Sequence, residues 1–212
     1  MISIALVDYM GSDLSTVNSA RVSFAKTKEA MDAGDEKLIN YLADHKHITP
    51  FRHNAIQLRC KAPIFLARQL GKHQAGLSWN EVSRRYVDSE PEFYYPPEWR
   101  ERPSKSIKQG SGQTHPETEQ WENYYAALMS VSLSAYQAML DDNVAPEMAR
   151  MVLPQSMLTE WYWTGNLVSF AHVYNERIAP TAQEEARIFA MNLDAVIRSK
   201  FPISWAALTQ EK

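Results

Sequence analysis

Alternating apolar and polar positions mark one clear strand at residues 54–62. Its apolar residues share one face and its polar residues share the other. The apolar face holds Ile56, Leu58, Cys60 and Ala62. We therefore expect Cys60 to be an inert core residue, since the basic side chains beside it point away. Further strands are expected at residues 2–7 and 158–164, and a short aromatic strand at 93–95.

Helical periodicity fills most of the remaining chain. Helices are expected at residues 12–22, 36–44, 64–73, 145–151 and 167–175. Two capping-box patterns, Thr114 with Glu117 and Thr181 with Glu184, predict the starts of longer helices that run to about 142 and 200. The polar stretch 101–113 is expected to be a mobile loop, either ordinary surface or a lid. The length and apolar content of the chain predict a single domain over residues 1–212.

Composition narrows the class of protein. The chain has 212 residues, 45% of them hydrophobic, which is enough for one sizeable core. A net charge of −3 and the lack of a basic stripe disfavour a nucleic-acid partner. No run of about 18 apolar residues is present, so we expect no membrane span and a cytoplasmic protein. A single cysteine excludes a disulfide framework within the chain.

The stretch from Gln69 to Tyr86 concentrates candidate chemistry. Arg84 and Arg85 beside Ser83 offer forked donors and a hydroxyl, which suit a phosphate monoester. On residue types alone, a charged surface turn explains the same window. Three histidines at 45, 47 and 53 suggest a metal site, but their spacing is not that of a helical zinc site, so we expect no metal.

The same stretch resembles the signature of the flavin-dependent thymidylate synthases. In that family an Arg-His-Arg triplet precedes a Ser-x-Asn-Glu-x-Ser-x-Arg-Tyr motif; here residues 72–74 read KHQ and residues 78–86 read SWNEVSRRY. Further segments keep the family's order along nearly the whole chain, including ARVSF at 20–24, HITPF at 47–51, ARMVLP at 149–154 and NER at 175–177.

The resemblance implies a fold, an activity and a set of roles. The implied fold is α+β, a twisted and mainly antiparallel sheet with several helices. The resemblance also implies a homotetramer with FAD at subunit junctions, converting dUMP to dTMP with 5,10-methylenetetrahydrofolate as carbon donor and NADPH as reductant. Arg177 would activate the uracil base. The implied dUMP shell comprises Gln69, Lys72, Glu81, Ser83, Arg84, Arg85, Arg150 and Arg177. The implied cofactor shell comprises Ser23, His47, Thr49, Lys72, His73, Gln74, Asn80, Glu81, Asn166 and His172, with His47 also a neighbour of the folate.

Several positions depart from the family pattern. Lys72 and Gln74 replace two arginines of the triplet, Val168 replaces an arginine that meets the flavin, and Arg52 stands where a glutamate is common. These changes leave open an alternative, a nucleotide-binding homologue with impaired catalysis. For single residues the ordinary structural roles also stay open: an ion pair with Glu147 for Arg150, and a helix-end partner for Arg177.

Overall fold

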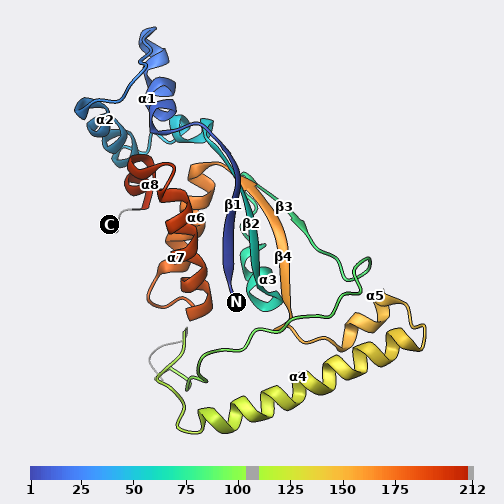
Figure 1. Ribbon diagram of the computed structural model, residues 1–212. Helices are drawn as coiled ribbons and strands as arrows, with labels where there is room; N and C mark the ends of the chain where they lie inside the picture. Colours follow the sequence, from blue (N-terminus) through green and yellow to red (C-terminus); the bar gives the residue numbers. More distant parts are fainter. Residues whose placement is uncertain (104–109, 210–212) are drawn as a thin grey trace.

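The computed structural model describes residues 1–103 and 110–209, and its centre is a four-stranded sheet (Figure 1). The strands are β1 (Ser3–Met10), β2 (Ala55–Pro63), β3 (Leu77–Glu81) and β4 (Leu158–Gly165). They pair in the order β1-β2-β4-β3, and each pairing is antiparallel. The expected α+β class with an antiparallel sheet is confirmed.

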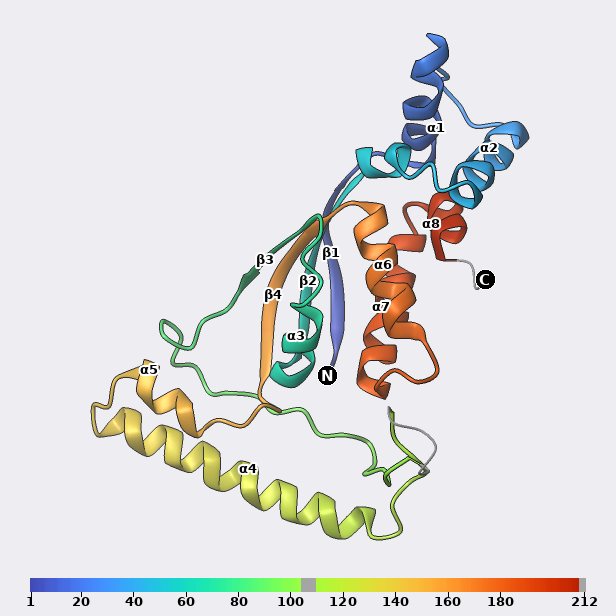
Figure 2. The ribbon, with the colours of Figure 1, turned by 180° about the vertical axis from the view of Figure 1, so that it is seen from behind.

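The described residues also form eight α-helices and three short helical segments. The α-helices are α1 (Asp13–Arg21), α2 (Ala33–Asp44), α3 (Ile64–Leu70), α4 (Thr118–Asp141), α5 (Pro146–Ala149), α6 (Leu167–Ile178), α7 (Glu184–Arg198) and α8 (Pro202–Thr209). Three short 3₁₀ segments are η1 (Val22–Phe24), η2 (Thr49–His53) and η3 (Arg150–Val152). Seen from behind, α3 lies against β2 and β4 (Figure 2).

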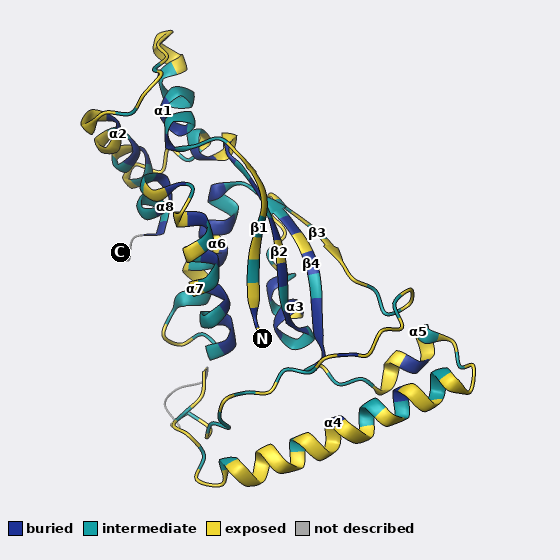
Figure 3. Cartoon of the chain, viewed as in Figure 1, coloured by how far each residue is buried: buried dark blue, intermediate teal, exposed yellow. Residues whose placement is uncertain are grey.

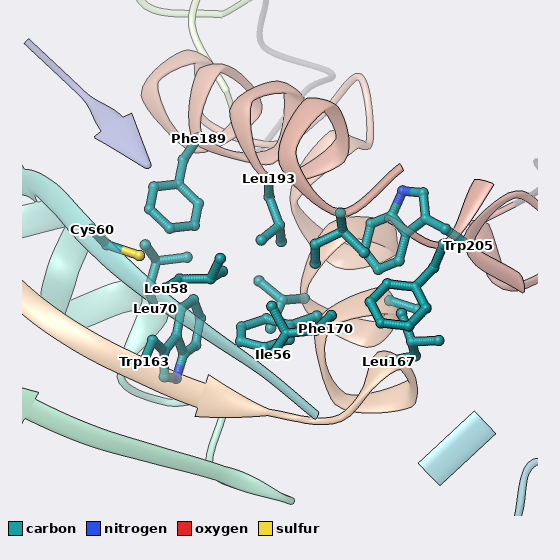
Figure 4. Close-up of a cluster of buried hydrophobic side chains, with 14 of the residues drawn as sticks. Ile56, Leu58, Cys60, Leu70, Trp163, Leu167, Phe170, Phe189, Leu193 and Trp205 are labelled. Carbon is teal, nitrogen blue, oxygen red and sulfur yellow. The ribbon is translucent and has the colours of Figure 1, made fainter. Parts of the chain in front are cut away.

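The core lies between the inner sheet face and α3, α6, α7 and α8 (Figure 4). Ile56, Leu58 and Cys60 of β2 are buried there, as their alternation predicts. Aromatic rings fill much of the remaining space: Trp79 stacks on Trp161 with ring centroids 4.2 Å apart. The same alternation turns Arg59, between Leu58 and Cys60, to the open face of the sheet.

The long helix α4 lies apart from this core. It crosses below the end of the sheet and is mostly exposed (Figure 3). Met129 and Tyr136 are its only buried residues. Two side-chain contacts hold it in place: Tyr125 Oη, in its first half, donates to the carbonyl oxygen of Tyr94 at 2.7 Å, and Ser132 Oγ, near its middle, donates to that of Val152 at 2.7 Å.

Both expected capping boxes are wrong. Helix α4 begins at Thr118, and the Thr114 hydroxyl hydrogen-bonds the Glu98 carboxylate instead. Helix α7 begins at Glu184 after Gln183, with no side-chain cap, so Thr181 lies outside it. In both places the hydroxyl stands too far before the first helical turn to reach its free N–H groups.

Several other elements have boundaries that differ from those expected. The helix expected at 64–73 ends at Leu70, and residues 77–81 form β3, a strand that was not expected. The expected aromatic strand at 93–95 reduces to one isolated bridge between Phe93 and Met157. Helix α2 begins at Ala33 because the Asp32 side chain caps it.

Helix α8 was not expected. Its first turn is capped from the other end of the chain: the buried Asp13 carboxylate accepts the backbone N–H groups of Ile203 at 3.0 Å and Ser204 at 2.8 Å. Residues 104–109 of the expected mobile loop lie outside the described residues. On either side of them, the Gly112 N–H donates to the Glu101 carbonyl oxygen at 2.8 Å.

Candidate functional site

A cavity of about 500 Å³ lies where the segment after β3 crosses the end of the sheet. Ser83, Arg84 and Arg150 line it. Two backbone bonds fix the crossing segment to β4: Val82 N–H donates to the Glu160 carbonyl at 2.9 Å, and Leu158 N–H donates to the Glu92 carbonyl at 2.7 Å. Strand pairing therefore carries Ser83 and Arg84 into the wall of this cavity, which we call the serine–arginine cavity.

The cations of the serine–arginine cavity fall into two groups. Arg59 and Lys61 are held by carboxylates, Glu160 at 2.6 Å and Glu92 at 2.7 Å. The hydrogen bond from the Lys61 ammonium is the largest cause of the lowered pKa of Glu92, and burial of the carboxylate opposes it only weakly.

Arg84 and Arg150 bond backbone carbonyl oxygens, those of Ser89 and Glu147. The expected alternative for Arg150, an ion pair with the Glu147 carboxylate, is therefore wrong. These two guanidinium groups keep donors for an incoming anion.

Arg85 does not line the serine–arginine cavity, although it is adjacent to Arg84. Its Nε bonds Ser83 Oγ at 3.3 Å, and its guanidinium lies 4.9 Å from the centre of the exposed Tyr86 ring. The two neighbouring arginines therefore have different surroundings, and in a single chain only Arg84 faces the cavity together with Ser83.

Glu81 stands between two cavities. It lines the serine–arginine cavity and a second one of about 450 Å³, between α3 and β3, which Lys72 and His73 also line. Both of its carboxylate oxygens are held: Oε1 accepts from Thr159 Oγ1 at 2.8 Å, and Oε2 accepts from Trp79 Nε1 at 3.2 Å. An exposed carboxylate bonded on both oxygens keeps one orientation at the junction.

Asn80 does not join Glu81. Because successive side chains of a strand point to opposite faces, Asn80 lies with its cross-strand partner Tyr162 on the open face of the sheet. Glu81 shares the inner face with Trp79 and Trp161. Within one chain these two adjacent residues cannot contact the same ligand group.

A third cavity, of about 690 Å³, continues past the end of α3 and reaches α6. We call it the histidine cavity. It shares Lys72, His73 and Gln74 with the second cavity. Its far wall comes from Asn166, His172 and Arg52. The Asn166 amide oxygen is already used, because it caps α6 by accepting Ser169 N–H at 3.0 Å.

Arg177 lies behind His73. Its Nε and Nη2 both contact His73 Nε2, at 3.1 and 2.9 Å. Since a guanidinium only donates, His73 Nε2 is the acceptor and carries no proton. Burial of the ring, together with the charge of Arg177, lowers the pKa of His73 to about 4. The imidazole is therefore neutral at pH 7 and holds the guanidinium in place.

The remaining predicted residues are not gathered in these cavities. Ser23 is exposed at η1, and His47 and Thr49 are exposed beside α2; none of the three lines the serine–arginine, second or histidine cavity. Gln69 lies in α3, where its amide oxygen is buried without a hydrogen-bond partner in the described structure. An unpartnered buried oxygen of this kind calls for a donor from outside the chain.

Sequence reasoning missed three residues at these cavities. Thr159 orients Glu81, and its place on the inner face of β4 follows from strand alternation alone. Arg59 and Lys61 line the serine–arginine cavity from β2. Arg52 was noted only as a departure from the family pattern, although it adds a cation to the histidine cavity.

In residues 1–103 and 110–209, no group of three or more histidine, cysteine, aspartate or glutamate side chains has the arrangement to hold a metal ion. Among the same residues, no helix is long and apolar enough to cross a membrane. Burial raises the pKa of the Cys60 thiol, so this residue is a poor nucleophile at neutral pH.

Comparison with known proteins places this arrangement in a family. Residues 5–203 match the family model described as thymidylate synthase complementing protein. A flavin-dependent thymidylate synthase of Thermus thermophilus is 37% identical over 98% of this chain and 75% of its own length. One from Thermosipho africanus is 38% identical over 95% of this chain and 88% of its own.

A solved structure agrees with these relatives. The UMP/dUMP methylase PolB from Streptomyces cacaoi, bound with 5-Br dUMP, superposes with a TM-score of 0.89 at 31% identity. The match covers 99% of this chain and 95% of that one. With its sheet order, its paired arginines and a family match over nearly its full length, this chain belongs to the thymidylate synthase complementing protein family.

Proposed function

We propose that this chain, as a single domain, is a flavin-dependent thymidylate synthase that converts dUMP to dTMP. Carbon comes from 5,10-methylenetetrahydrofolate and reducing equivalents come from NADPH. One observation carries the proposal. Arg84 and Arg150, neither of which has an ion-pair partner among the described residues, lie beside Ser83 in one cavity, in a chain 37–38% identical to enzymes of this name.

The nucleotide phosphate would bind in the serine–arginine cavity. A phosphate monoester needs several donors, and Ser83, Arg84 and Arg150 supply a hydroxyl and two guanidinium groups there. Arg85 and Gln69 would add donors from just outside, and Lys72 with Glu81 would contact the sugar and base from the second cavity. Glu81 suits a hydroxyl or N–H group because its carboxylate is held in one orientation.

Arg177 would act on the base. Methylation at C5 of uracil requires electron density on that carbon, which increases when negative charge along N3 and the flanking carbonyls is stabilised. A guanidinium aimed at these atoms provides that stabilisation without a proton transfer. The neutral His73 ring leaves Arg177 its full positive charge, because no carboxylate bonds it in the described structure.

The residues of the histidine cavity fit a flavin nucleotide. The cavity offers cations, amides and imidazoles and has room on the scale of a cofactor site. Lys72, His73, Gln74, Asn166 and His172 would hold FAD there, with Ser23, Thr49 and Asn80 supplied from elsewhere in the assembly and His47 beside the folate. When bound, the flavin supplies the hydride that reduces the transferred carbon to a methyl group.

A homotetramer would complete the site. Within one chain Arg84 and Arg150 face one cavity, while Arg177 stands behind another. Ser23 and Asn80 line neither the serine–arginine cavity nor the histidine cavity. Helix α4 offers a surface for assembly: four apolar residues at helical spacing, between 45% and 65% exposed, are Trp121, Tyr124, Leu128 and Val131.

The test is an anaerobic incubation of purified protein with dUMP, methylenetetrahydrofolate, FAD and NADPH, assayed for dTMP. UMP is run in parallel because the superposed methylase acts on both nucleotides by name. We expect dTMP from the wild type and none from Arg177→Ala, with an unchanged circular dichroism spectrum. Full turnover by Arg177→Ala contradicts its role.

Lys72, Gln74 and Val168 favour one second candidate, a nucleotide-binding homologue that no longer turns over, because each replaces a cation by a weaker or neutral group. A colourless protein that binds dUMP and makes no dTMP would establish it.

A further inference from the structure

The histidine cavity has an uncompensated positive charge. Its lining contains two fixed cations, Arg52 and Lys72, and no carboxylate. The other polar groups in its wall are amides, imidazoles and the hydroxyl of Ser169. A concave wall with two cations and no anion attracts a ligand that carries negative charge.

Arg52 has no carboxylate partner among the described residues, in contrast to several other arginines of the chain. Arg21, Arg59 and Arg100 each hold a carboxylate, at distances of 2.6 to 2.9 Å. Arg52 forms no ion pair with any residue in 1–103 or 110–209, and it is exposed. Its guanidinium keeps its donors for a ligand.

The backbone around Arg52 is fixed. Phe51 before it is fully buried, and Asn54 after it is buried and donates from Nδ2 to Thr16 Oγ1 at 2.9 Å. Segment η2, which carries Arg52, also contacts α6, the helix that forms the opposite wall. The side chain therefore starts from a rigid base on one side of the cavity, while Lys72 approaches from the end of α3 on another.

We propose that Arg52 binds a phosphate group of the flavin nucleotide, with Lys72 as the second cation of the same clamp. This rests on the proposed function, which puts FAD in the histidine cavity. Arg52 would provide the bidentate contact that Gln74 and Val168, both neutral and both in the lining, cannot make. Positive charge in this cavity thus comes from η2 as well as from Lys72 at the end of α3.

The test compares Arg52→Gln with the wild type in binding titrations of FAD, FMN and riboflavin, followed by flavin fluorescence at several salt concentrations. Lys37→Gln is the matched control, because it removes one positive charge from an exposed position on α2. We expect Arg52→Gln to weaken FAD and FMN binding about 10-fold or more, as lost charge-assisted hydrogen bonds do. Riboflavin, which has no phosphate, should bind equally to all three proteins, and the salt dependence of FAD binding should become shallower in Arg52→Gln.

Two results overturn the clamp: FAD affinity in Arg52→Gln within twofold of wild type, or an equal loss of riboflavin and FAD. Arg52→Lys provides a second variant with the charge kept and the fork lost, for which we expect an intermediate FAD affinity.

Failure of the proposed function gives a different result. If the wild type makes no dTMP yet binds FAD, or ADP as a flavin-free probe, more tightly than Arg52→Gln does, the clamp stands and the enzyme assignment fails. If the wild type binds neither probe, the clamp is wrong.

Discussion

The neutral state of His73 is the prediction that the geometry makes most sharply. The ring accepts two contacts from the Arg177 guanidinium at one nitrogen, at 3.1 and 2.9 Å. Protonating that nitrogen would replace an attraction by the repulsion of two cations. Together with burial of the ring, this lowers the pKa of His73 from its ordinary 6.5 to about 4.

The stability consequence has a definite sign. Between pH 4 and 6.5 the unfolded chain binds a proton at His73 and the folded chain does not, so stability falls as pH falls through this window. Without solvent screening, the pKa difference between 6.5 and 4 corresponds to about 3 kcal/mol of folding free energy. Because the ring is only half-buried, solvent screening reduces this to about 1 kcal/mol.

The assay is NMR of ¹³C-labelled histidine rings, with the His73 signal assigned by its loss in His73→Gln. We expect the His73 signal to titrate near pH 4. In Arg177→Ala the pKa should rise only part of the way to 6.5, because burial, the larger cause, remains. In urea unfolding between pH 7 and 4, His73→Gln should lose about 1 kcal/mol less stability than the wild type. A His73 midpoint at or above 6.5 refutes the acceptor role.

Two further predictions concern buried groups. Asp13→Ala should lower the free energy of unfolding by about 2–3 kcal/mol, because it leaves two buried N–H groups of α8 without an acceptor. Urea denaturation measures this against Asp44→Ala, an exposed carboxylate on α2, and equal losses in the two variants would contradict the capping role. Cys60→Ser should keep most of its dTMP formation, since the thiol is buried in the core, and should lose about 1–2 kcal/mol of stability to the unpartnered hydroxyl. Loss of turnover with normal stability and flavin content would show that the thiol takes part in the reaction.

The core strand was predictable because its signal is local. Every second residue of β2 is apolar, and burial of Ile56, Leu58 and Cys60 follows from that alternation whatever packs against it. Most helices also follow from periodicity of this kind. The family resemblance then supplied the fold class, which the sheet order and the superposition with the methylase confirm.

Two of the wrong assignments, at Thr114 and at α8, share a physical cause, namely that the deciding partner is distant in the chain. Thr114 resembles an N-cap in sequence, but Glu98 takes its hydroxyl. Helix α8 has no capping residue in its own segment, and its cap is Asp13. A local sequence pattern contains only residues a few positions apart, so it cannot predict a cap from a carboxylate near the opposite terminus.

For the site, residue types were easier to predict than their directions. Asn80 and Glu81 were grouped as neighbours in one motif, yet strand geometry turns them to opposite faces of the sheet. The apolar residues at Leu77 and Trp79 already carried that signal, because they alternate with Ser78 and Asn80. The surface-turn interpretation of this stretch missed that signal, because a turn does not fix which side of a sheet each residue faces.

Substitutions in a binding motif are better interpreted as a set than one at a time. Gln74 and Val168 each look like the loss of a cation, and taken singly they favour a weakened cofactor site. Arg52 reverses that conclusion, because it lines the same cavity and no carboxylate there neutralises it. A phosphate responds to the summed field and to the available donors, whichever segment provides them. Charge can therefore move from one wall of a cavity to another while the ligand it selects stays the same.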